Sequence, residues 1–307
     1  MKTIVTGGAG FIASHIVDGL ITVGHEVAVI DNLSTGLKEN LNPKAKFYEK
    51  DITDKKTVGE IFQTEMPEAV FHLAAQASVP HSVKEPAEDV RINVIGIINL
   101  LEAATAAKTK KFVFSSTGGA LYGDDVARPT IEEAKIAPIS PYGIDKLFSE
   151  TYMGYFASLS AMKMIRLRYS NVYGPRQNPL GEAGVIAIFG AKMLKNEEYL
   201  LFGTGEQTRD YVFVGDVVRA NLAALEREVT GAFNVATAKE TSLNEIVKNL
   251  RQITATTAPE KKMPARKEQM YSCLSIDKAT RELGWTPQMT LEEGLKQTVD
   301  YIKKHQA

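Results

Sequence analysis

The chain has 307 residues, of which 44% are apolar and 24% are charged, and its formal net charge is −1. A nearly neutral chain of this ordinary composition has no bulk electrostatic attraction for nucleic acid or for an anionic membrane. Cys273 is the single cysteine, which excludes an intrachain disulfide and a cysteine-based zinc cluster. We therefore expect a cytoplasmic protein with no metal, no nucleic-acid partner and no membrane segment.

Short β-branched segments alternate with amphipathic helical segments through the first two-thirds of the chain. Such alternation predicts the α/β class and a doubly wound parallel sheet of the Rossmann type. The strand segments are almost continuously apolar, as expected for a parallel sheet that is buried on both faces. The predicted strands are residues 2–6, 26–31, 46–50, 69–74, 111–116 and 163–168, and the predicted helices are residues 11–23, 55–63, 87–107 and 142–160.

The pattern loosens after about residue 171, where "GPRQNPLGEAG" is rich in glycine and proline and is typical of a connection. Further strands are predicted within residues 209–213 and 231–236, and further helices at 214–225, 243–253 and from 290 onward. We predict two domains. The first is a nucleotide-binding domain of residues 1–168 with a return segment at about 210–238, and the second is a smaller, partly interleaved substrate domain of residues 169–307.

The segment "KTIVTGGAGFIASH" follows the first predicted strand and opens the first helix. Gly7 and Gly10 allow a tight turn and a close approach to a pyrophosphate, whose charge the helix N-terminus attracts. Ala13 takes the third position of the motif, where a small residue lets the helix pack on the sheet. These features predict a dinucleotide site.

Two carboxylates follow the next strands. Asp31 ends the second strand, where a carboxylate accepts both ribose hydroxyls of an adenosine and repels a 2′-phosphate, so we predict NAD rather than NADP. Turn formers in "DNLSTG" also suit a simple cap at this position. Asp51 ends the third strand, near the expected adenine, or alternatively caps the following helix.

Tyr142 and Lys146 lie one turn apart at the start of the helix that "SPYGIDK" opens. Lowering a tyrosine pKa from about 10 to about 7 requires roughly 4 kcal/mol. An ammonium about 5 Å away supplies on the order of 3 kcal/mol at an effective dielectric constant near 20. Oxidised nicotinamide is a second cation, and Thr117, at the end of the preceding strand, offers a hydroxyl to the same substrate oxygen. The sequence therefore predicts an oxidoreductase-type centre, against the alternative of an exposed amphipathic pair.

The chain resembles the extended short-chain dehydrogenase/reductases, and among them the UDP-glucose (UDP-galactose) 4-epimerases. The resemblance rests on "TGGAGFIASH", "DNLSTG", "HLAAQASV", "FSSTGGALYG", "SPYGIDK" and "LRYSNVYGPR", in this order, and covers nearly the whole chain. It implies that NAD oxidises a UDP-sugar at C4, that the 4-keto sugar turns, and that the hydride returns to the other face. It also implies a homodimer formed through the helices predicted at 87–107 and 142–160.

Residue roles follow from the same resemblance. Tyr142 is implied as general base and acid, Lys146 as the residue that holds the nicotinamide ribose and lowers the tyrosine pKa, and Thr117 as their hydroxyl partner. The implied NAD-binding residues are Gly7, Gly10, Phe11, Ile12, Asp31, Asn32, Asp51, Ile52, Leu73, Ala74, Ala75, Asn93 and Ser115, together with Tyr142 and Lys146. The implied substrate-binding residues are Thr117, Asn171, Phe202, Arg209, Arg266 and Cys273.

The sequence departs from the family pattern at several positions. Ala77 stands where some members carry a second lysine, and "PARKEQ" keeps Arg266 but replaces the glycine and acid that usually follow. Cys273 occupies a position where residue size affects whether an N-acetyl group fits beside the sugar, so we expect N-acetylhexosamines to be accepted; a cysteine packed in a core is the alternative.

Other reactions on the same scaffold are partly excluded. Gly118 and Gly119 follow Thr117, where 4,6-dehydratases carry an acid–base pair and UDP-glucuronate decarboxylases a glutamate. A 4-keto-sugar reductase, a uronate or pentose 4-epimerase and a non-catalytic NAD-binding sensor remain open as alternatives to the hexose 4-epimerase.

Overall fold

The structure is a computed structural model, and it describes residues 1–179, 184–265 and 269–305. Its centre is a seven-stranded sheet in the order β11-β6-β5-β4-β1-β2-β3, in which every pair of neighbours is parallel. This is the strand order of a doubly wound dinucleotide-binding sheet, extended by one strand, so the predicted fold class is confirmed. The strands are β1 (Lys2–Thr6), β2 (Glu26–Asp31), β3 (Lys46–Glu49), β4 (Ala69–His72), β5 (Lys111–Thr117), β6 (Lys163–Tyr169) and β11 (Gly231–Val235).

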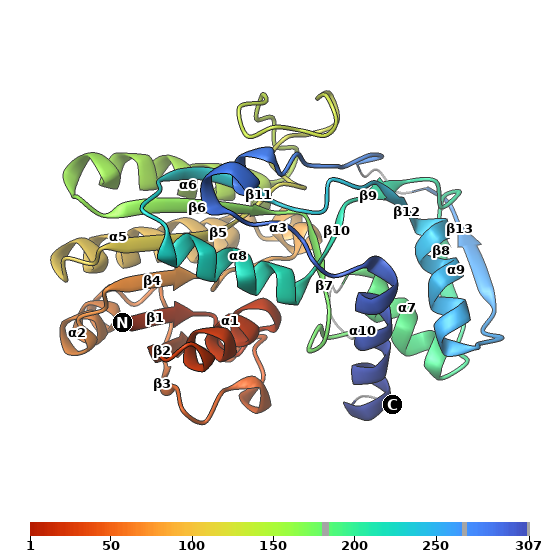
Figure 1. The fold of residues 1–307 in the computed structure, drawn as a ribbon, viewed down its shortest axis with the longest axis horizontal. Coiled ribbons are helices and arrows are strands. Elements are labelled where there is room, and N and C mark those ends of the chain that lie inside the picture. The colour runs from red at the N-terminus through yellow and green to blue at the C-terminus, as the bar shows by residue number, and fades with distance from the viewer. Residues whose placement is uncertain (180–183, 266–268, 306–307) are drawn as a thin grey trace.

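Helices cover both faces of this sheet because alternate strand residues point to opposite sides. Val5 and Val29 pack toward one face, under α1 and α8, whereas Ile4 and Ile30 pack toward the other, under α2, α5 and α6. Figure 1 shows these helices layered around the strands. The helices are α1 (Phe11–Thr22), α2 (Lys55–Glu65), α5 (Gly96–Ala106), α6 (Pro141–Leu159) and α8 (Val214–Glu226).

A second, smaller hydrophobic core lies in the C-terminal part, on the right of Figure 1. Its helices are α7 (Val185–Leu194), α9 (Leu243–Thr254) and α10 (Leu291–His305). Its strands form three pairs: β7 (Asn171–Tyr173) with β10 (Tyr211–Phe213), β8 (Tyr199–Phe202) with β13 (Glu260–Met263), and β9 (Thr208–Arg209) with β12 (Thr241–Ser242). The chain therefore leaves the large sheet after β6 and returns to it as β11.

The helix predicted at residues 87–107 differs from the structure. It begins as α4 (Pro86–Val90), continues as a π-helical segment η2 (Arg91–Ile95) and becomes α5 only at Gly96. A π-helical turn inserts one residue into the helical ladder and re-aims the side chains that follow, often at functional sites. The short helix α3 (Val79–Lys84) precedes it. The remaining short segments are η1 (Lys38–Asn40) and η3 (Ala279–Leu283).

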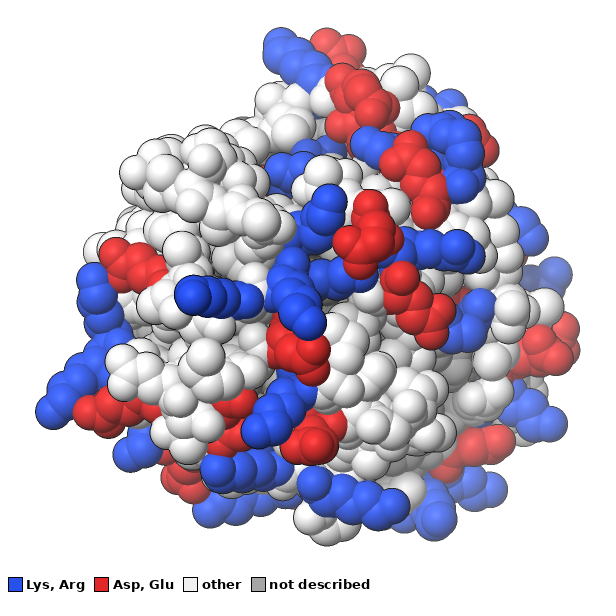
Figure 2. All heavy atoms as spheres, turned by 60° about the vertical axis from the view of Figure 1, so that its left-hand side comes forward, with Lys and Arg blue, Asp and Glu red and all other residues white. Residues whose placement is uncertain are grey.

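Charge is mixed over the surface that Figure 2 shows, where basic and acidic side chains are interspersed. This agrees with the formal net charge of −1. None of the helices in the described part of the chain combines the length and the apolar character needed to cross a membrane.

Candidate active site

The turn between β1 and α1 forms the expected cradle. Gly7 has φ of +75°, and a Cβ atom placed on it would lie 2.7 Å from the backbone nitrogen of Ala74, so a larger residue would clash with the neighbouring loop. Gly10 is the N-cap of α1 and provides no side-chain capping bond. The first N–H groups of a helix have no acceptors within the helix, so those of Phe11 and Ile12 suit an anionic pyrophosphate. This cradle fits a dinucleotide.

Asp31 is buried at the end of β2 and faces the same turn. Its Oδ2 accepts a hydrogen bond from Ala9 N at 3.0 Å, and its Oδ1 accepts one from Leu33 N at 2.8 Å. Asp31 therefore caps the turn and can also bind the adenosine ribose, so the two predicted roles are compatible. A carboxylate has about four acceptor positions, so two backbone bonds fix its orientation and leave capacity for ribose hydroxyls.

Asn32, Asp51 and Ile52 lie together at the ends of β2 and β3. Asn32 Nδ2 donates to Asp51 Oδ2 at 3.0 Å, and Thr53 N and Oγ1 both donate to Asp51 Oδ1 at 2.8 Å. Partial burial alone would raise the pKa of Asp51, but these hydrogen bonds outweigh it and lower the pKa below its usual value. Ile52 is buried below Gly96, where an added Cβ would lie 2.6 Å from it. These residues therefore form a fixed, ionised edge beside the expected adenine position.

The loop after β4 completes the cofactor side. Leu73 N and Ala74 N both lie 3.2 Å from Thr6 Oγ1, so β1 positions this loop, which continues through Ala75. Asn93, in the π-helical segment, exchanges two hydrogen bonds with Gln76: its Nδ2 donates to Gln76 O at 2.9 Å, and its Oδ1 accepts from Gln76 N at 3.0 Å. The irregular helix therefore holds the loop that the cofactor is expected to touch.

Tyr142 and Lys146 begin helix α6. Ser140 caps this helix by accepting a hydrogen bond from Gly143 N at 3.2 Å, and Pro141 occupies its first turn, as the sequence predicts. Lys146 Nζ lies 5.7 Å from the centroid of the Tyr142 ring and donates to Ser115 O at 2.8 Å. The ammonium is therefore anchored to the end of β5 beside the phenol.

The pKa values of this pair reflect burial. Desolvation lowers the pKa of Lys146 to about 8, although the charges of Asp89, Glu150 and Asp145 act in the opposite direction. Desolvation, with a smaller effect of Asp89, raises the pKa of Tyr142 above its ordinary value. Lys146 therefore does not acidify the phenol by itself in this structure. The predicted phenolate requires the further positive charge of a bound oxidised cofactor.

Thr117 ends β5, two residues after Ser115, whose carbonyl oxygen binds Lys146. Its Oγ1 accepts a hydrogen bond from Ala120 N at 3.2 Å, so the hydroxyl proton can be donated elsewhere. A Cβ on Gly118 would press against the end of the Leu274 side chain, whereas a Cβ on Gly119 would meet no atom within 4 Å.

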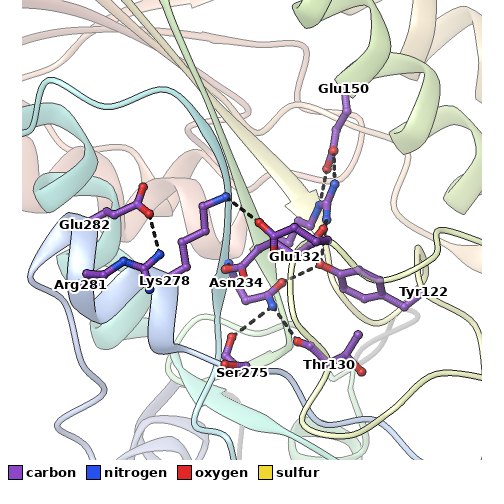
Figure 3. Close-up of polar contacts among 11 residues, drawn as sticks. Tyr122, Thr130, Glu132, Glu150, Asn234, Ser275, Lys278, Arg281 and Glu282 are labelled. Carbon is purple, nitrogen blue, oxygen red and sulfur yellow. Dashed lines mark hydrogen bonds and ion pairs between the residues drawn. The ribbon is translucent and has the colours of Figure 1, made fainter.

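A buried polar network supports this end of β5 and α6 (Figure 3). Arg168 forms a bidentate ion pair with Glu150, at 2.6 and 2.9 Å, and Ser116 Oγ donates to the same carboxylate at 2.6 Å. Arg168 Nη1 also donates to the hydroxyl of Tyr122, which donates to Asn234 Oδ1 on β11. Strands β5, β6 and β11 and helix α6 are thus connected through one network.

Three of the expected substrate residues lie on the smaller part of the fold. Asn171 begins β7, where its N donates to Asp210 O at 2.9 Å; Phe202 ends β8; and Arg209 in β9 donates through Nη1 to Thr208 O at 2.8 Å. Asp216, which lies near Arg209 in the sequence, is ion-paired with Arg219.

Cys273 is buried beside the loop that follows β5, and its backbone oxygen accepts a hydrogen bond from Thr130 N at 2.8 Å. Burial and the charge of Asp210 raise the pKa of the Cys273 thiol to about 12, so the side chain is a small neutral group. Arg266 lies outside the described residues. No group of His, Cys, Asp and Glu in the described ranges could hold a metal ion.

Sequence reasoning missed several residues around the dyad. Gln76, Asp89, Asp145 and the pair of Glu150 with Arg168 surround Lys146 or the loop beside it. The only local signal was an aspartate directly before the lysine in "GIDK".

A glycine cradle, an acidic residue after β2 and a Tyr–Lys pair after β5 on a doubly wound sheet define an NAD-dependent protein of the short-chain dehydrogenase/reductase class. Residues 3–236 match the NAD dependent epimerase/dehydratase family, and the chain belongs to this family. The predicted family and cofactor are thereby confirmed.

Relatives place the chain more closely. It is 52% identical to a UDP-glucose 4-epimerase from Thermotoga maritima solved with UDP-glucose, with a TM-score of 0.97 and 99% of each chain covered. It is 40% identical to the Thermus thermophilus UDP-glucose 4-epimerase solved with NAD, with a TM-score of 0.95, 99% of this chain and 100% of the other covered. The UDP-glucose 4-epimerase of Mycolicibacterium smegmatis is 41% identical, with 99% of each chain covered. The similarity supports the predicted isomerase class.

Proposed function

We propose that the protein interconverts UDP-glucose and UDP-galactose by epimerisation at C4, with Tyr142 as the general base and acid. The observation that carries the proposal is that Lys146 lies beside Tyr142 and binds Ser115 O near the end of β5, the strand that Thr117 ends, on the same edge of the sheet as the Gly7–Gly10 cradle. The full-length similarity to UDP-glucose 4-epimerases supports the same reaction.

The residues present fit NAD. The first turn of α1 and Asp31 would hold its pyrophosphate and adenosine ribose, and Lys146 would hold the nicotinamide ribose. When bound, NAD supplies reversible hydride acceptance at one carbon of the sugar. The chain itself supplies the proton chemistry: Tyr142 removes the proton of the C4 hydroxyl and returns it after the keto sugar has turned.

Thr117 and Lys146 assist Tyr142 in different ways. The Thr117 hydroxyl, held by Ala120 N, donates to the same sugar oxygen and orients it. Lys146, held by Ser115 O, keeps a positive charge beside the phenol and stabilises its ionised form. The sugar must be free to turn, so binding energy has to come from the UDP group.

We assign that UDP grip to the smaller part of the fold. Arg209 offers a guanidinium fork that suits phosphate oxygens, Asn171 offers an amide, and Phe202 offers a ring face for uracil. Arg266 belongs to the same proposal from the sequence alone. The location of Asn171, Phe202 and Arg209 on β7, β8 and β9, in the part of the chain outside the seven-stranded sheet, supports it.

The reaction can be tested by incubating the NAD-loaded protein with UDP-galactose and no reductant. Appearance of UDP-glucose up to a constant ratio supports the epimerase. Turnover only after addition of NADH indicates a 4-keto-sugar reductase instead. Bound NAD with no turnover of UDP-hexoses, UDP-uronates or UDP-pentoses would leave a non-catalytic sensor and contradict the proposal.

We further propose that Cys273 leaves room for an N-acetyl group, so that UDP-N-acetylhexosamines are also substrates. The small, neutral side chain supports this, while its burial fits the alternative of a cysteine packed in a core. Replacing it by Tyr adds several heavy atoms, so Cys273→Tyr should lower turnover of UDP-N-acetylglucosamine relative to UDP-glucose by about tenfold or more. Cys273→Ser, which keeps the size, is the matched control. An unchanged ratio in the tyrosine variant would show that the residue does not gate the pocket.

A homodimer and a cytoplasmic location complete the proposal. The outer side of α6 exposes a row of large apolar side chains, namely Ile144, Phe148, Tyr152, Tyr155 and Leu159. Contiguous apolar surface of this kind marks an association site. The single cysteine, buried and unpaired, fits a reducing compartment.

A further inference from the structure

Two buried aspartates lie next to the catalytic dyad. Asp89 in α4 is 0% exposed and Asp145 in α6 is 1% exposed, and the two carboxyl groups are close enough that Asp89 raises the pKa of Asp145. Carboxylate oxygens only accept hydrogen bonds, so a bond between two such groups requires that one of them hold a proton.

The surroundings favour this shared proton. Asp89 Oδ1 accepts from Gln76 Nε2 at 2.5 Å, but within the described structure Oδ2 of Asp89 and Oδ2 of Asp145 are buried with no donor. Two fully ionised carboxylates facing each other without water would repel strongly and lose their hydration. Burial and Asp89 accordingly raise the pKa of the Asp145 carboxyl to about 7.

The other groups around this pair come from several elements. On α6 they are Tyr142, Lys146 and Glu150; on β4 there is His72, whose pKa burial lowers so that the ring is neutral; and on α3 and α4 the half-exposed His81 and Glu88 pair with each other. Glu150 already pairs with Arg168, so its charge is largely compensated. Of the three carboxylates that act on Lys146, Asp89 raises its pKa most.

The charge of the pair affects the two catalytic groups in opposite ways. Lys146 is desolvated, and its hydrogen-bond partner among the described residues is a neutral carbonyl, Ser115 O, so a nearby negative charge raises its pKa and helps it to keep its proton. The same charge raises the pKa of Tyr142 and opposes phenolate formation. One negative charge stabilises the Lys146 ammonium and destabilises the Tyr142 phenolate moderately. Two negative charges would destabilise the phenolate about twice as much.

We propose that Asp89 and Asp145 act as a positioning pair that shares one proton and presents a single negative charge, which keeps Lys146 an ammonium during the reaction. Gln76 fixes the Asp89 end, and Gln76 in turn is held by Asn93 beside the cofactor loop. The inference rests on the proposed epimerase function for its kinetic consequences, but the shared proton itself does not depend on that function.

The proposal can be tested with variants that leave the pair with either one negative charge or none. Asp89→Asn and Asp145→Asn each replace the shared proton by an amide donor and keep one negative charge, whereas the double variant is neutral. Rates of UDP-galactose conversion by the NAD-loaded proteins should be measured between about pH 5 and pH 10. Each single variant should stay within about threefold of wild type across this pH range. In the double variant the alkaline limb should move down by about one pH unit, so that activity falls by only about twofold near pH 7 but by about tenfold at pH 9 and above.

Infrared spectroscopy gives a second measurement that needs no turnover. The wild-type protein should show the C=O band of a protonated carboxylic acid near neutral pH, and each single variant should lose it. Glu132 is another buried carboxyl whose pKa is raised by burial, and it lies in the network of Figure 3. Glu132→Gln therefore serves as a matched control that identifies its own band and should leave the alkaline limb unmoved.

Two results would overturn the proposal. One is that the single variants lose as much activity as the double variant at every pH, because the aspartates would then merely hold α4 against α6. The other is that no carboxylic acid band of the wild type at neutral pH depends on Asp89 or Asp145. A wild-type protein without epimerase activity would refute the proposed function, and the infrared result would still decide whether the proton is shared.

Discussion

The pKa values of Tyr142 and Lys146 depend on the protein groups that replace water around each side chain. Burial lowers the pKa of Lys146 to about 8 and raises the pKa of Tyr142, so desolvation shifts both side chains toward their neutral forms. A negative charge near Lys146 favours its ammonium form. The positive charge of an oxidised cofactor near Tyr142 favours the phenolate. The dyad is therefore expected to become active only when the cofactor is bound.

Tyr142→Phe should lower the epimerisation rate by about 10²–10⁴-fold, because the ring remains but no group removes the C4 hydroxyl proton. Binding of UDP-sugar should persist, since the proposed UDP contacts lie elsewhere. Steady-state rates and calorimetric titration with UDP-galactose measure the two effects separately. Tyr152→Phe, which changes a phenol on the outer side of the same helix, is the control. Near-normal turnover by the Tyr142 variant would remove the assigned role.

The protonation of Asp145 should also appear in the stability of the fold. Its folded pKa of about 7 exceeds the value of about 3.9 expected in the unfolded chain, so the native state binds more protons between these values. Stability contributed by this group is therefore present at low pH and is lost as the pH rises through about 7. Asp145→Asn should become more stable relative to wild type between about pH 5 and about pH 8, as measured by urea unfolding. A difference that does not change with pH would contradict a raised pKa.

At the scale of elements, the regular parts of the nucleotide-binding sheet follow from local sequence. The alternation of apolar segments predicted strands β1 to β6, with ends that lie within a few residues of the observed ones. The motif "TGGAGF" predicted the β1–α1 turn because its glycines act locally. The π-helical segment at residues 91–95 could not be predicted from local sequence, and the bonds of its Asn93 reach Gln76, in a loop 17 residues away along the chain. The strands of the smaller part have two to four residues, too few for a periodic pattern to be visible.

Some candidate site residues could be predicted from local motifs, whereas others depend on contacts between distant segments. Gly7, Asp31, Tyr142 and Lys146 lie within short motifs that follow strands, and the structure brings them to one edge of the sheet. Asp89 and Asp145 come from helices far apart in the sequence, and their relation exists only after α4 packs on α6. A single sequence carries no local pattern for such a pair.

The ion pair between Arg168 and Glu150 joins β6 to α6 and is almost fully buried, with side-chain exposures of 5% and 7%. Arg168→Met should leave the Glu150 charge uncompensated and reduce the free energy of unfolding by about 3–5 kcal/mol. Arg281→Met removes an exposed pair with Glu282 and should change it by less than about 1 kcal/mol. Denaturant unfolding of both variants makes the comparison. Equal effects would show that the buried network does not tie the two elements together.

For the whole molecule, the apolar row on α6 predicts the assembly. Phe148 and Tyr155 are 52% and 58% exposed, which is unusual for neighbouring aromatic residues on one helix of a monomer. Light scattering should give the mass of a dimer at micromolar concentration. Phe148→Glu combined with Tyr155→Glu should give a monomer, because two charges would be buried without partners. Val23→Glu, at the exposed end of α1, should leave the mass unchanged. A monomeric wild-type protein would refute the predicted dimer.

The return of the chain as β11 has a consequence for recombination between members of the family. Residues 231–235 pair with β6 along its length, so the outer edge of the sheet is made by a segment that follows β7 to β10 in the chain. A chimaera joined at one crossover point after β6 would place a foreign strand against this edge and a foreign Asn234 against Tyr122 and Glu132. Exchange of sugar preference between such enzymes should therefore succeed only with two crossovers that spare β10, α8 and β11.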